Sequence, residues 1–429
     1  MKKPKLISII LASLLLFAGC SSNASGKPTA NSAVALPVYP QTIAFDDYEA
    51  KNTVLTENDP DEEFIRALTR FAVSSTGTLL SSTRENQMYS PISLYYPLAL
   101  CAVGAGGETK SQLLEALQMA GFDDDYIADQ SARLFRCLYT DNEVFRLNLA
   151  NSLWMAQYSF KENFLNTAAK EFYAALYEVD FSQDSTAKEM AKWVSEHTGG
   201  LINPEYNFSE DLVLMILNTV YFKDAWSKPF EKQLTEADEF TLSDGSVVTA
   251  DFMNMTSNRN YIDGDGWSLL PLRTVGGATM NFVLPDEGIA PEDLMAPEKL
   301  TAILGAEGES VFAQVTASIP KFDFGVENGL KELLLALGAT HALDPELADF
   351  SNMADDGMFI SSARQLARIS IDEEGVEAAA YTEISMDATS ALVDEPQPVE
   401  LIFDRPFLFF IEYQGVILFT GIVQNPTAG

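Results

Sequence analysis

Histidine, cysteine and basic residues are scarce in this chain of 429 residues. The two histidines, His197 and His341, lie outside any HExxH pattern, and the chain has no GxSxG sequence and no phosphate-binding glycine loop. Asp263-Gly-Asp-Gly266 lacks the spacing of a calcium loop and is typical of a turn. Three cysteines do not make a disulfide scaffold. The sequence therefore predicts a protein that is not an enzyme and that carries no metal and no cofactor.

Acidic residues outnumber basic residues by 62 to 27, which gives a net charge of −35. A surface of this sign repels phosphate backbones, so we expect no nucleic-acid partner. Cationic proteins would instead be attracted and steered toward it. Hydrophobic residues make up 47% of the chain, which is enough to build a large core without disulfide support.

The N-terminus has the pattern of a processed signal. Lys2, Lys3 and Lys5 precede an apolar run from Leu6 to Phe17, which is short for a membrane-spanning helix. Small residues follow, and Cys20 comes directly after them, as at the lipid-attachment site of bacterial lipoproteins. We expect residues 1–19 to be removed and Cys20 to carry a lipid that anchors the protein at the cell surface. The alternative is a plain signal peptide and secretion; either cleavage removes three lysines and leaves a net charge of −38.

The mature chain is predicted to be a tether followed by one domain. Residues 20–58 are rich in Ser, Asn, Ala, Thr and Pro without a sustained apolar period, which predicts a flexible tether. No repeat and no Pro/Gly-rich linker divides residues 59–429, so we expect a single domain there. Cys101 and Cys137 lie in apolar helical patterns and are expected to be free thiols in the core.

Helical and strand-like patterns alternate irregularly along this domain. Apolar spacing predicts helices over residues 62–79, 91–103, 161–177 and 328–337. Strands are predicted over residues 147–153, 212–222, 279–284, 311–319 and 401–411. Because the mixture has no regular strand–helix–strand rhythm, the expected fold class is α+β.

Alternate residues of the segment Glu373–Thr389 differ in character. One set is small or apolar and consists of Val376, Ala378, Ala380, Thr382, Ile384 and Met386. The residues between them are mostly polar, so the period of two predicts a strand with one face on a core. Yet residues 385–398 contain acids, Ser and two prolines, which are typical of an exposed loop. The pattern indicates a segment that is a loop in one state and a strand in another; an edge strand or an alanine-rich helix are the alternatives.

Several motifs resemble those of the serpin family, over residues 60–429. The most specific are Leu401–Ile411, followed by Phe419-Thr-Gly421 and Asn425-Pro426, and Asn218–Trp226, followed by Pro229-Phe230. Supporting matches are Ser90-Pro-Ile-Ser93, Phe282–Asp286, Ile319-Pro-Lys321 and Leu337–Thr340. The resemblance implies a serpin fold, with about nine helices around three β-sheets and an exposed reactive loop.

The resemblance also implies roles for individual residues. The inhibitory hinge would consist of Glu373, Gly375, Val376, Glu377, Ala378, Ala379, Ala380 and Thr382. The cluster at the opening of the main sheet would consist of Ser90, Ser93, Asn218, Gln365, Trp226 and Lys321, with Lys321 paired to Glu373. Gln365 stands where serpins usually have a histidine that bonds the equivalent of Asn218. Glutamine both donates and accepts, so we expect the hydrogen-bond network to persist without a pH response.

The activity that the resemblance implies is suicide inhibition of a serine protease. The protease would cleave the loop, and the loop would then insert into the central sheet while the protease is held in a covalent acyl complex with a monomeric inhibitor. The inhibitory register, counted from Glu373, places the reactive bond between Thr389 and Ser390, within a window from Met386 to Val393. No Lys or Arg occurs between residues 368 and 405, which excludes trypsin-like targets and favours elastase-like or subtilisin-like ones.

One alternative is a non-inhibitory serpin that acts as a binding protein. Such relatives often carry bulky or charged residues at the inward-facing hinge positions. Here those positions are Val, Ala, Ala and Thr, which favours the inhibitor. An enzyme is disfavoured because no general base is apparent.

Overall fold

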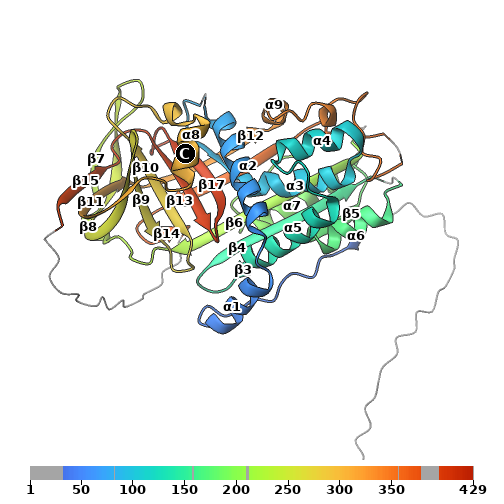
Figure 1. The fold of residues 1–429 in the computed structure, drawn as a ribbon, viewed down its shortest axis with the longest axis horizontal. Coiled ribbons are helices and arrows are strands. Elements are labelled where there is room, and N and C mark those ends of the chain that lie inside the picture. Colours follow the sequence, from blue (N-terminus) through green and yellow to red (C-terminus); the bar gives the residue numbers. More distant parts are fainter. Residues whose placement is uncertain are drawn as a thin grey trace, which may run out of the picture. The chain divides into compact units, whose positions relative to one another are not determined.

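The computed structural model describes residues 32–81, 83–156, 159–208, 212–355, 357–377 and 396–428 (Figure 1). These residues form nine α-helices, the number expected. The helices are α1 (Tyr48–Glu57), α2 (Glu62–Leu80), α3 (Pro91–Gly104), α4 (Gly107–Ala116), α5 (Asp124–Leu138), α6 (Glu162–Lys170), α7 (Asp184–His197), α8 (Pro297–Leu304) and α9 (Lys331–Ala336). Three short 3₁₀ helices are η1 (Lys232–Leu234), η2 (Pro291–Leu294) and η3 (His341–Leu343).

The strands belong to two hydrogen-bonded sheets. The first contains β1 (Ser32–Ala35), β3 (Thr140–Asp141), β4 (Arg146–Met155), β5 (Ala174–Glu178), β6 (Leu214–Ala225), β12 (Phe322–Gly329), β13 (Arg364–Ile371) and β14 (Gly375–Val376). The second contains β2 (Gln87–Tyr89), β7 (Glu236–Thr241), β8 (Val247–Gly264), β9 (Trp267–Arg273), β10 (Thr279–Pro285), β11 (Glu309–Pro320), β15 (Pro398–Ile402), β16 (Phe407–Tyr413) and β17 (Val416–Val423).

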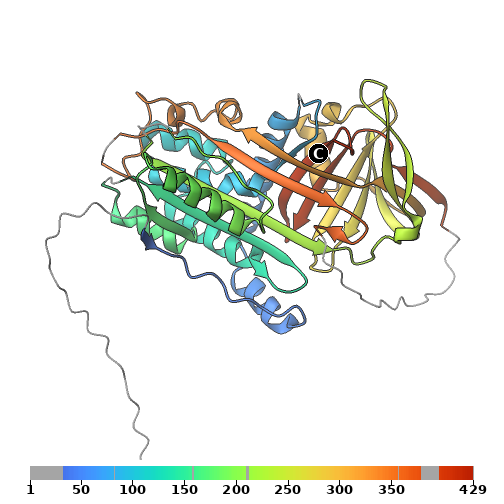
Figure 2. The ribbon, with the colours of Figure 1, turned by 180° about the vertical axis from the view of Figure 1, so that it is seen from behind.

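The first sheet carries the candidate site and is covered on both faces. Its strand order is β1-β5-β4-β6-β14-β13-β12, with β3 paired to β4. Along β4 the side chains alternate, so that Leu147, Leu149 and Leu153 enter the main core while Ala150 and Trp154 pack with α7. Figures 1 and 2 show α7 on one face and the group of α3 and α5 on the other. Both faces of β4 are therefore covered, and most of its residues are buried.

The described residues form two sheets where three were expected, and the second sheet explains this difference. Its order is β15-β11-β8-β9-β10-β16-β17-β2. The long strand β8 pairs with β11 along most of its length and with β9 at its C-terminal end. Because hydrogen bonds continue through β8, the strands outside the first sheet form one network. The predicted α+β class is confirmed.

Residues 32–58 correct the prediction of a flexible tether over residues 20–58. β1 adds a strand to the edge of the first sheet, where Ser32 lies opposite Glu178 of β5. Tyr39 stacks on Phe135 and Tyr139, with ring centroids 6.1 and 5.3 Å away. The helix α1 follows, so the folded domain begins at Ser32 and not at residue 59. The local composition is that of a linker, and the contacts that order it come from distant parts of the chain.

Two of the predicted helices are shorter than expected. The helix predicted over residues 161–177 ends at Lys170, because Tyr173 adopts a left-handed backbone (φ +51°) and residues 174–178 form β5. The helix predicted from residue 328 begins at Lys331, because Asn328 still belongs to β12 and lies opposite Gln365 of β13. Tertiary strand pairing overrides local helical spacing in both cases.

The remaining predicted helices and strands of the domain agree with the structure to within a few residues, with one division. The predicted strand over residues 401–411 is split into β15 and β16. Cys101 and Cys137 are buried and unpaired, as expected. Among the described residues, no helix is both long and apolar enough to cross a membrane.

A buried carboxylate joins the two sheets beside the candidate site. Asp224, near the C-terminal end of β6, is inaccessible to solvent. Its carboxylate accepts hydrogen bonds from the backbone N–H of Ala225 (2.9 Å) and of Gly276 (3.1 and 3.0 Å), in the turn between β9 and β10. Burial raises the pKa of Asp224 from 3.8 to about 7, although hydrogen bonds from Thr274, Gly276 and Ala225 and the nearby charge of Lys51 oppose the rise.

This carboxyl should make the stability of the domain pH-dependent. Between pH 4 and 7 folded Asp224 keeps a proton that the unfolded chain has released, so stability falls as pH rises, by roughly 4 kcal/mol over three pKa units. In Asp224→Asn the midpoint of thermal unfolding should change less with pH between 5 and 8 than in the wild type, when both are measured at one scan rate. The control Asp238→Asn, on the exposed strand β7, should keep the wild-type slope. Equal slopes in wild type and Asp224→Asn would contradict this assignment.

Candidate functional site

A tight turn reverses the chain after β13 and begins the candidate hinge. The Asp372 side chain accepts hydrogen bonds from the backbone N–H of Glu374 (2.8 Å) and of Gly375 (3.2 Å). The backbone N–H of Asp372 donates to the carbonyl of Gly375 (3.1 Å). Aspartate is suited to such turns because its side chain bonds the backbone two residues ahead. The turn directs the next residues back along β13.

The two residues after this turn, Gly375 and Val376, lie between β13 and β6. Val376 lies opposite Ile371 on one side and Asp224 on the other, and Gly375 lies opposite Ala225. The Val376 side chain is 3% exposed and belongs to the main core, so the prediction that it faces inward is confirmed. A Cβ on Gly375 would lie 2.2 Å from the carbonyl oxygen of Asp224, which explains the glycine.

Glu377 is the last hinge residue that the structure describes. Its φ is +49°, a left-handed conformation that side-chain-bearing residues adopt rarely. Its side chain was expected to face solvent, but it is half-buried and accepts a hydrogen bond from the Tyr221 hydroxyl (3.2 Å). Burial raises the pKa of Glu377, against the hydrogen bond from Tyr221. The hydrogen bond between Tyr221 and the Glu377 carboxylate therefore holds the hinge against β6.

An ion pair lies at the end of the first sheet, next to the start of the hinge. Lys321 lies 3.1 Å from the carboxylate of Glu373, as the resemblance implied. Thr235, which the sequence did not single out, donates to the same carboxylate (2.8 Å). Burial alone would raise the pKa of Glu373, but the bonds from Thr235 and Lys321 bring that pKa below its ordinary value. The acid is therefore held in its charged form.

Trp226 holds the turn from below. Its ring N–H donates to the carbonyl of Asp372 (2.9 Å), and its backbone N–H donates to the carbonyl of Glu374 (2.9 Å). The indole itself is 2% exposed. The predicted neighbours Trp226, Lys321 and Glu373 thus meet around the start of the hinge.

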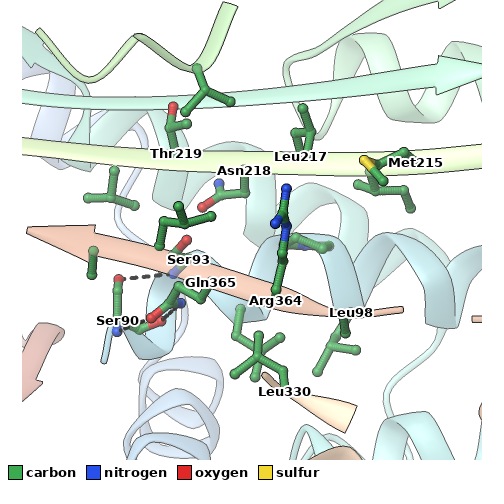
Figure 3. A pocket seen from close by; sticks show the side chains of 18 of the residues that line it. Ser90, Ser93, Leu98, Met215, Leu217, Asn218, Thr219, Leu330, Arg364 and Gln365 are labelled. Atoms are coloured by element: carbon green, nitrogen blue, oxygen red, sulfur yellow. Dashed lines mark hydrogen bonds between the residues drawn. The ribbon is translucent and has the colours of Figure 1, made fainter. Parts of the chain in front are cut away.

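Halfway along the sheet, Gln365 of β13 is fixed to the start of α3. It accepts a hydrogen bond from the Ser90 backbone N–H (2.8 Å) and donates one to the Ser90 carbonyl (2.9 Å). Ser90 caps α3, because its hydroxyl oxygen accepts from the Ser93 N–H (3.2 Å) while the hydroxyl donates to the Leu418 carbonyl (2.7 Å). Figure 3 shows the bonds of Ser90 with Gln365 and Ser93, and the position of Asn218 nearby.

Asn218 of β6 is not part of this network, which corrects the expectation that Gln365 would bond it. Its side-chain N–H donates to Asn151 (2.7 Å), which in turn donates to the Phe172 carbonyl (2.6 Å). The side-chain oxygen of Asn218 is buried and has no hydrogen-bond partner among the residues that the structure describes. Gln365 directs one N–H and its side-chain oxygen to the Ser90 backbone, and neither of these bonds reaches Asn218. A buried unpaired acceptor has an energetic cost of about 1–3 kcal/mol.

A cavity of about 860 Å³ separates the two strands below β14. Ser90, Ser93, Asn218 and Gln365 all line it, together with much of β6 and β13. Within the described part of the chain, the facing edges of β6 and β13 pair with no strand other than β14. The cavity thus lies in line with β14 and continues its path through the sheet.

Other predicted residues lie outside the described ranges. These are Ala378, Ala379, Ala380, Thr382, the reactive bond Thr389–Ser390 with its window from Met386 to Val393, and Cys20. Over the residues that are described, no group of three or more His, Cys, Asp or Glu side chains is arranged to hold a metal ion.

The comparisons with known proteins agree with this geometry. The family model "Serpin (serine protease inhibitor)" matches residues 66–426. An "Uncharacterized serpin-like protein" of Methanosarcina acetivorans is 30% identical over 367 residues, covering 81% of this chain and 83% of its own length. "Serpin-Z1C" of Triticum aestivum is 31% identical and covers 83% of this chain and 95% of its own.

A solved structure has the same fold over nearly the whole chain. The crystal structure of the thermophilic serpin tengpin in the native state superimposes with a TM-score of 0.77 at 25% identity. It covers 92% of this chain and 99% of its own. The family match, the relatives and the shared fold lead to one conclusion: this chain belongs to the serpin family.

Proposed function

We propose that this protein inhibits serine proteases by inserting its cleaved loop as a new strand between β6 and β13. The observation that carries the proposal is the position of β14. Its two residues are already paired with both neighbours, and the cavity below them continues in the same direction. Members of this family are typically protease inhibitors and not catalysts.

The register of β14 defines where each inserted residue would lie. Because Val376 lies opposite Asp224 and Ile371, each step forward in the loop is a step backward along β6 and β13. Thr382 would then lie opposite Asn218 on one side and Gln365 on the other. Met386 would lie opposite Leu214, at the far end of β6. The side chains that the sequence predicts to face inward would then point into the cavity.

Insertion would also satisfy the unpaired acceptor at Asn218. Thr382 is an inward-facing position, and its hydroxyl group is a donor of the right length beside the Asn218 side-chain oxygen. The unpaired edges of β6 and β13 would gain about ten ladder hydrogen bonds, worth ~0.5–1.5 kcal/mol each. Burial of the inward-facing side chains adds to this gain, whereas ordering the loop opposes it. The uncut loop is held at both ends and is not free to extend along the gap, so we expect insertion only after cleavage.

The chemistry of capture needs only the target's own catalytic groups. The protease serine attacks the carbonyl carbon of Thr389, the peptide bond breaks, and the amine of Ser390 leaves with a proton. The serine and Thr389 are then joined by an ester. If the loop inserts before water attacks that ester, the protease is carried roughly 43 Å, the length of 13 strand residues. The displacement distorts its active site and traps the complex.

The target class follows from the residues around the reactive bond. The window from Met386 to Val393 offers small and aliphatic side chains, and no basic residue occurs between residues 368 and 405. An elastase-like or subtilisin-like pocket suits these side chains. We propose that the inhibitor acts as a monomer at the cell surface, held by a lipid on Cys20, or as a secreted protein if that cysteine is not lipidated.

Cleavage of the loop should raise the thermal stability of the protein. A single cut between Met386 and Val393 allows the freed segment to join the sheet, so the midpoint of thermal unfolding should rise by on the order of 10 °C or more. Differential scanning calorimetry of intact and cleaved protein measures this. An unchanged midpoint would remove the insertion proposal.

Val376→Arg should turn the inhibitor into a substrate. Val376 is buried at the entrance of the gap, and a guanidinium there should displace β14 from between β6 and β13, so that insertion would then have to bury the charge at a cost of several kcal/mol. Insertion would then lose its competition with hydrolysis of the ester, and each trapped protease should consume about ten times more inhibitor or worse. The measurement is the stoichiometry of inhibition of an elastase, with complexes counted on a denaturing gel.

Ala379→Arg is the matched control for this variant. By the same alternation position 379 faces solvent, so the added guanidinium should leave the stoichiometry near the wild-type value. Both variants should fold and be cut at the same bond. Equal loss of inhibition in the two variants would show that the register is wrong.

The negative surface should accelerate capture of basic proteases. With a net charge of −38 after signal removal, the association rate with a cationic elastase should fall as salt rises from 0.05 to about 0.5 M. Stopped-flow or progress-curve rates with an acidic protease of similar specificity serve as the control. Rates for the cationic enzyme that do not change with salt would contradict electrostatic steering.

A further inference from the structure

The N-terminal segment that enters the domain differs in charge from the rest of the chain. Residues 28–45 contain no charged residue, although the whole chain has 62 acids. This segment begins eight residues after Cys20 and includes β1. The acidic residues elsewhere in the protein should repel anionic surfaces, whereas this uncharged segment should not repel them.

Within this segment apolar side chains lie on both faces. Ala35 and Tyr39 pack against the main core. The alternate residues Val34, Leu36 and Val38 are 53, 64 and 88% exposed. The inward set explains why the segment is ordered, but nothing in the domain's own packing requires the outward set to be apolar. Three aliphatic side chains in a row on one exposed edge are typical of a contact surface.

The position of this edge is compatible with a membrane beside it. β1 is the outermost strand of the first sheet. Only residues 21–31 separate it from Cys20, a length with an average span near 20 Å and a maximum of about 40 Å. A lipid on Cys20 would therefore keep this edge close to the bilayer.

The hinge that leads to the reactive loop lies at the other end of the strands. Ser32, Glu178, Met155 and Leu214 are in one row across the first sheet, as successive strand pairs show. The hinge leaves the sheet beside Asp224, ten residues further along β6, which corresponds to roughly 33 Å. Figures 1 and 2 show β1, the darkest blue strand, at the end of the first sheet remote from β14.

We propose that the edge formed by residues 32–40 rests on the phospholipid surface, with Val34, Leu36 and Val38 among the lipid headgroups. The proposal deepens the anchoring at Cys20 proposed above and gives the anchored domain one orientation. The uncharged edge lies on the bilayer, and the loop remains accessible to proteases at the distant end of the sheet.

The test places a fluorescent reporter on this edge. It replaces the lipid on Cys20 with an artificial membrane anchor. The mature chain from Ser21 carries an N-terminal hexahistidine in place of Cys20 and is bound to phosphatidylcholine vesicles with a nickel-chelating lipid. An NBD dye is attached to Leu36→Cys or, as the control, to Phe312→Cys, a position 54% exposed on β11. Cys101 and Cys137 do not compete for the dye, because burial raises their thiol pKa to about 12 and 11.

Brominated phosphatidylcholine should quench the dye at position 36 at least about threefold more than at position 312. Adding Val34→Asp and Val38→Asp should abolish the difference, whereas Val247→Asp, at an exposed apolar residue of β8, should leave it unchanged. Equal quenching at positions 36 and 312 would overturn the proposal. A second result would also overturn the proposal: protection of the dye at position 36 from solvent in the absence of vesicles, increasing with protein concentration. A second copy of the chain would then cover the edge.

Inhibition is measured separately on the same proteins in solution. Val34→Asp with Val38→Asp should leave the stoichiometry of inhibition unchanged, because the loop lies at the other end of the sheet. Loss of quenching with intact inhibition would reject the membrane contact alone. Absence of a covalent complex with normal quenching would reject the inhibitor proposal alone.

Discussion

Within the described chain, the facing edges of β6 and β13 pair with no strand beyond β14, and the rest of the site depends on this gap. Backbone N–H and C=O groups need partners, and Gly375 and Val376 supply them only at the top of the gap. The hydrogen bonds at the turn, the Glu373–Lys321 ion pair and Trp226 all hold this short strand in place. The side-chain oxygen of Asn218 adds a buried acceptor without a partner in the middle of the gap. The arrangement favours a further strand and already specifies its register.

Local sequence was sufficient where local physics decides the outcome. The α3 start at Ser90, the inward side chain of Val376 and the buried free thiols follow from capping, alternation and apolar spacing. The family resemblance brought Glu373, Lys321 and Trp226 together correctly, since Lys321 pairs with Glu373 and Trp226 bonds the carbonyls of the residues on either side of Glu373. Thr235 was missed because it lies in no motif and contributes a single hydrogen bond.

Prediction failed where distant parts of the chain compete. β1 and β5 were assigned to a tether and a helix, because strand pairing across the sheet leaves no local period. Gln365 was expected to bond Asn218, but the Ser90 backbone offers it a donor and an acceptor together. Glu377 was expected in solvent, and the left-handed backbone instead directs its side chain to Tyr221. In each case the deciding partner is far away in sequence.

The most direct test of the account is the crystal structure of the protein after a single cut in the reactive loop. The account predicts a continuous strand between β6 and β13 that extends β14, with Thr382 opposite Asn218 and Gln365. The Thr382 hydroxyl should lie within hydrogen-bond distance of the Asn218 side-chain oxygen. A cleaved loop outside the sheet, or a strand shifted by one residue so that Tyr381 or Glu383 takes this place, would contradict it.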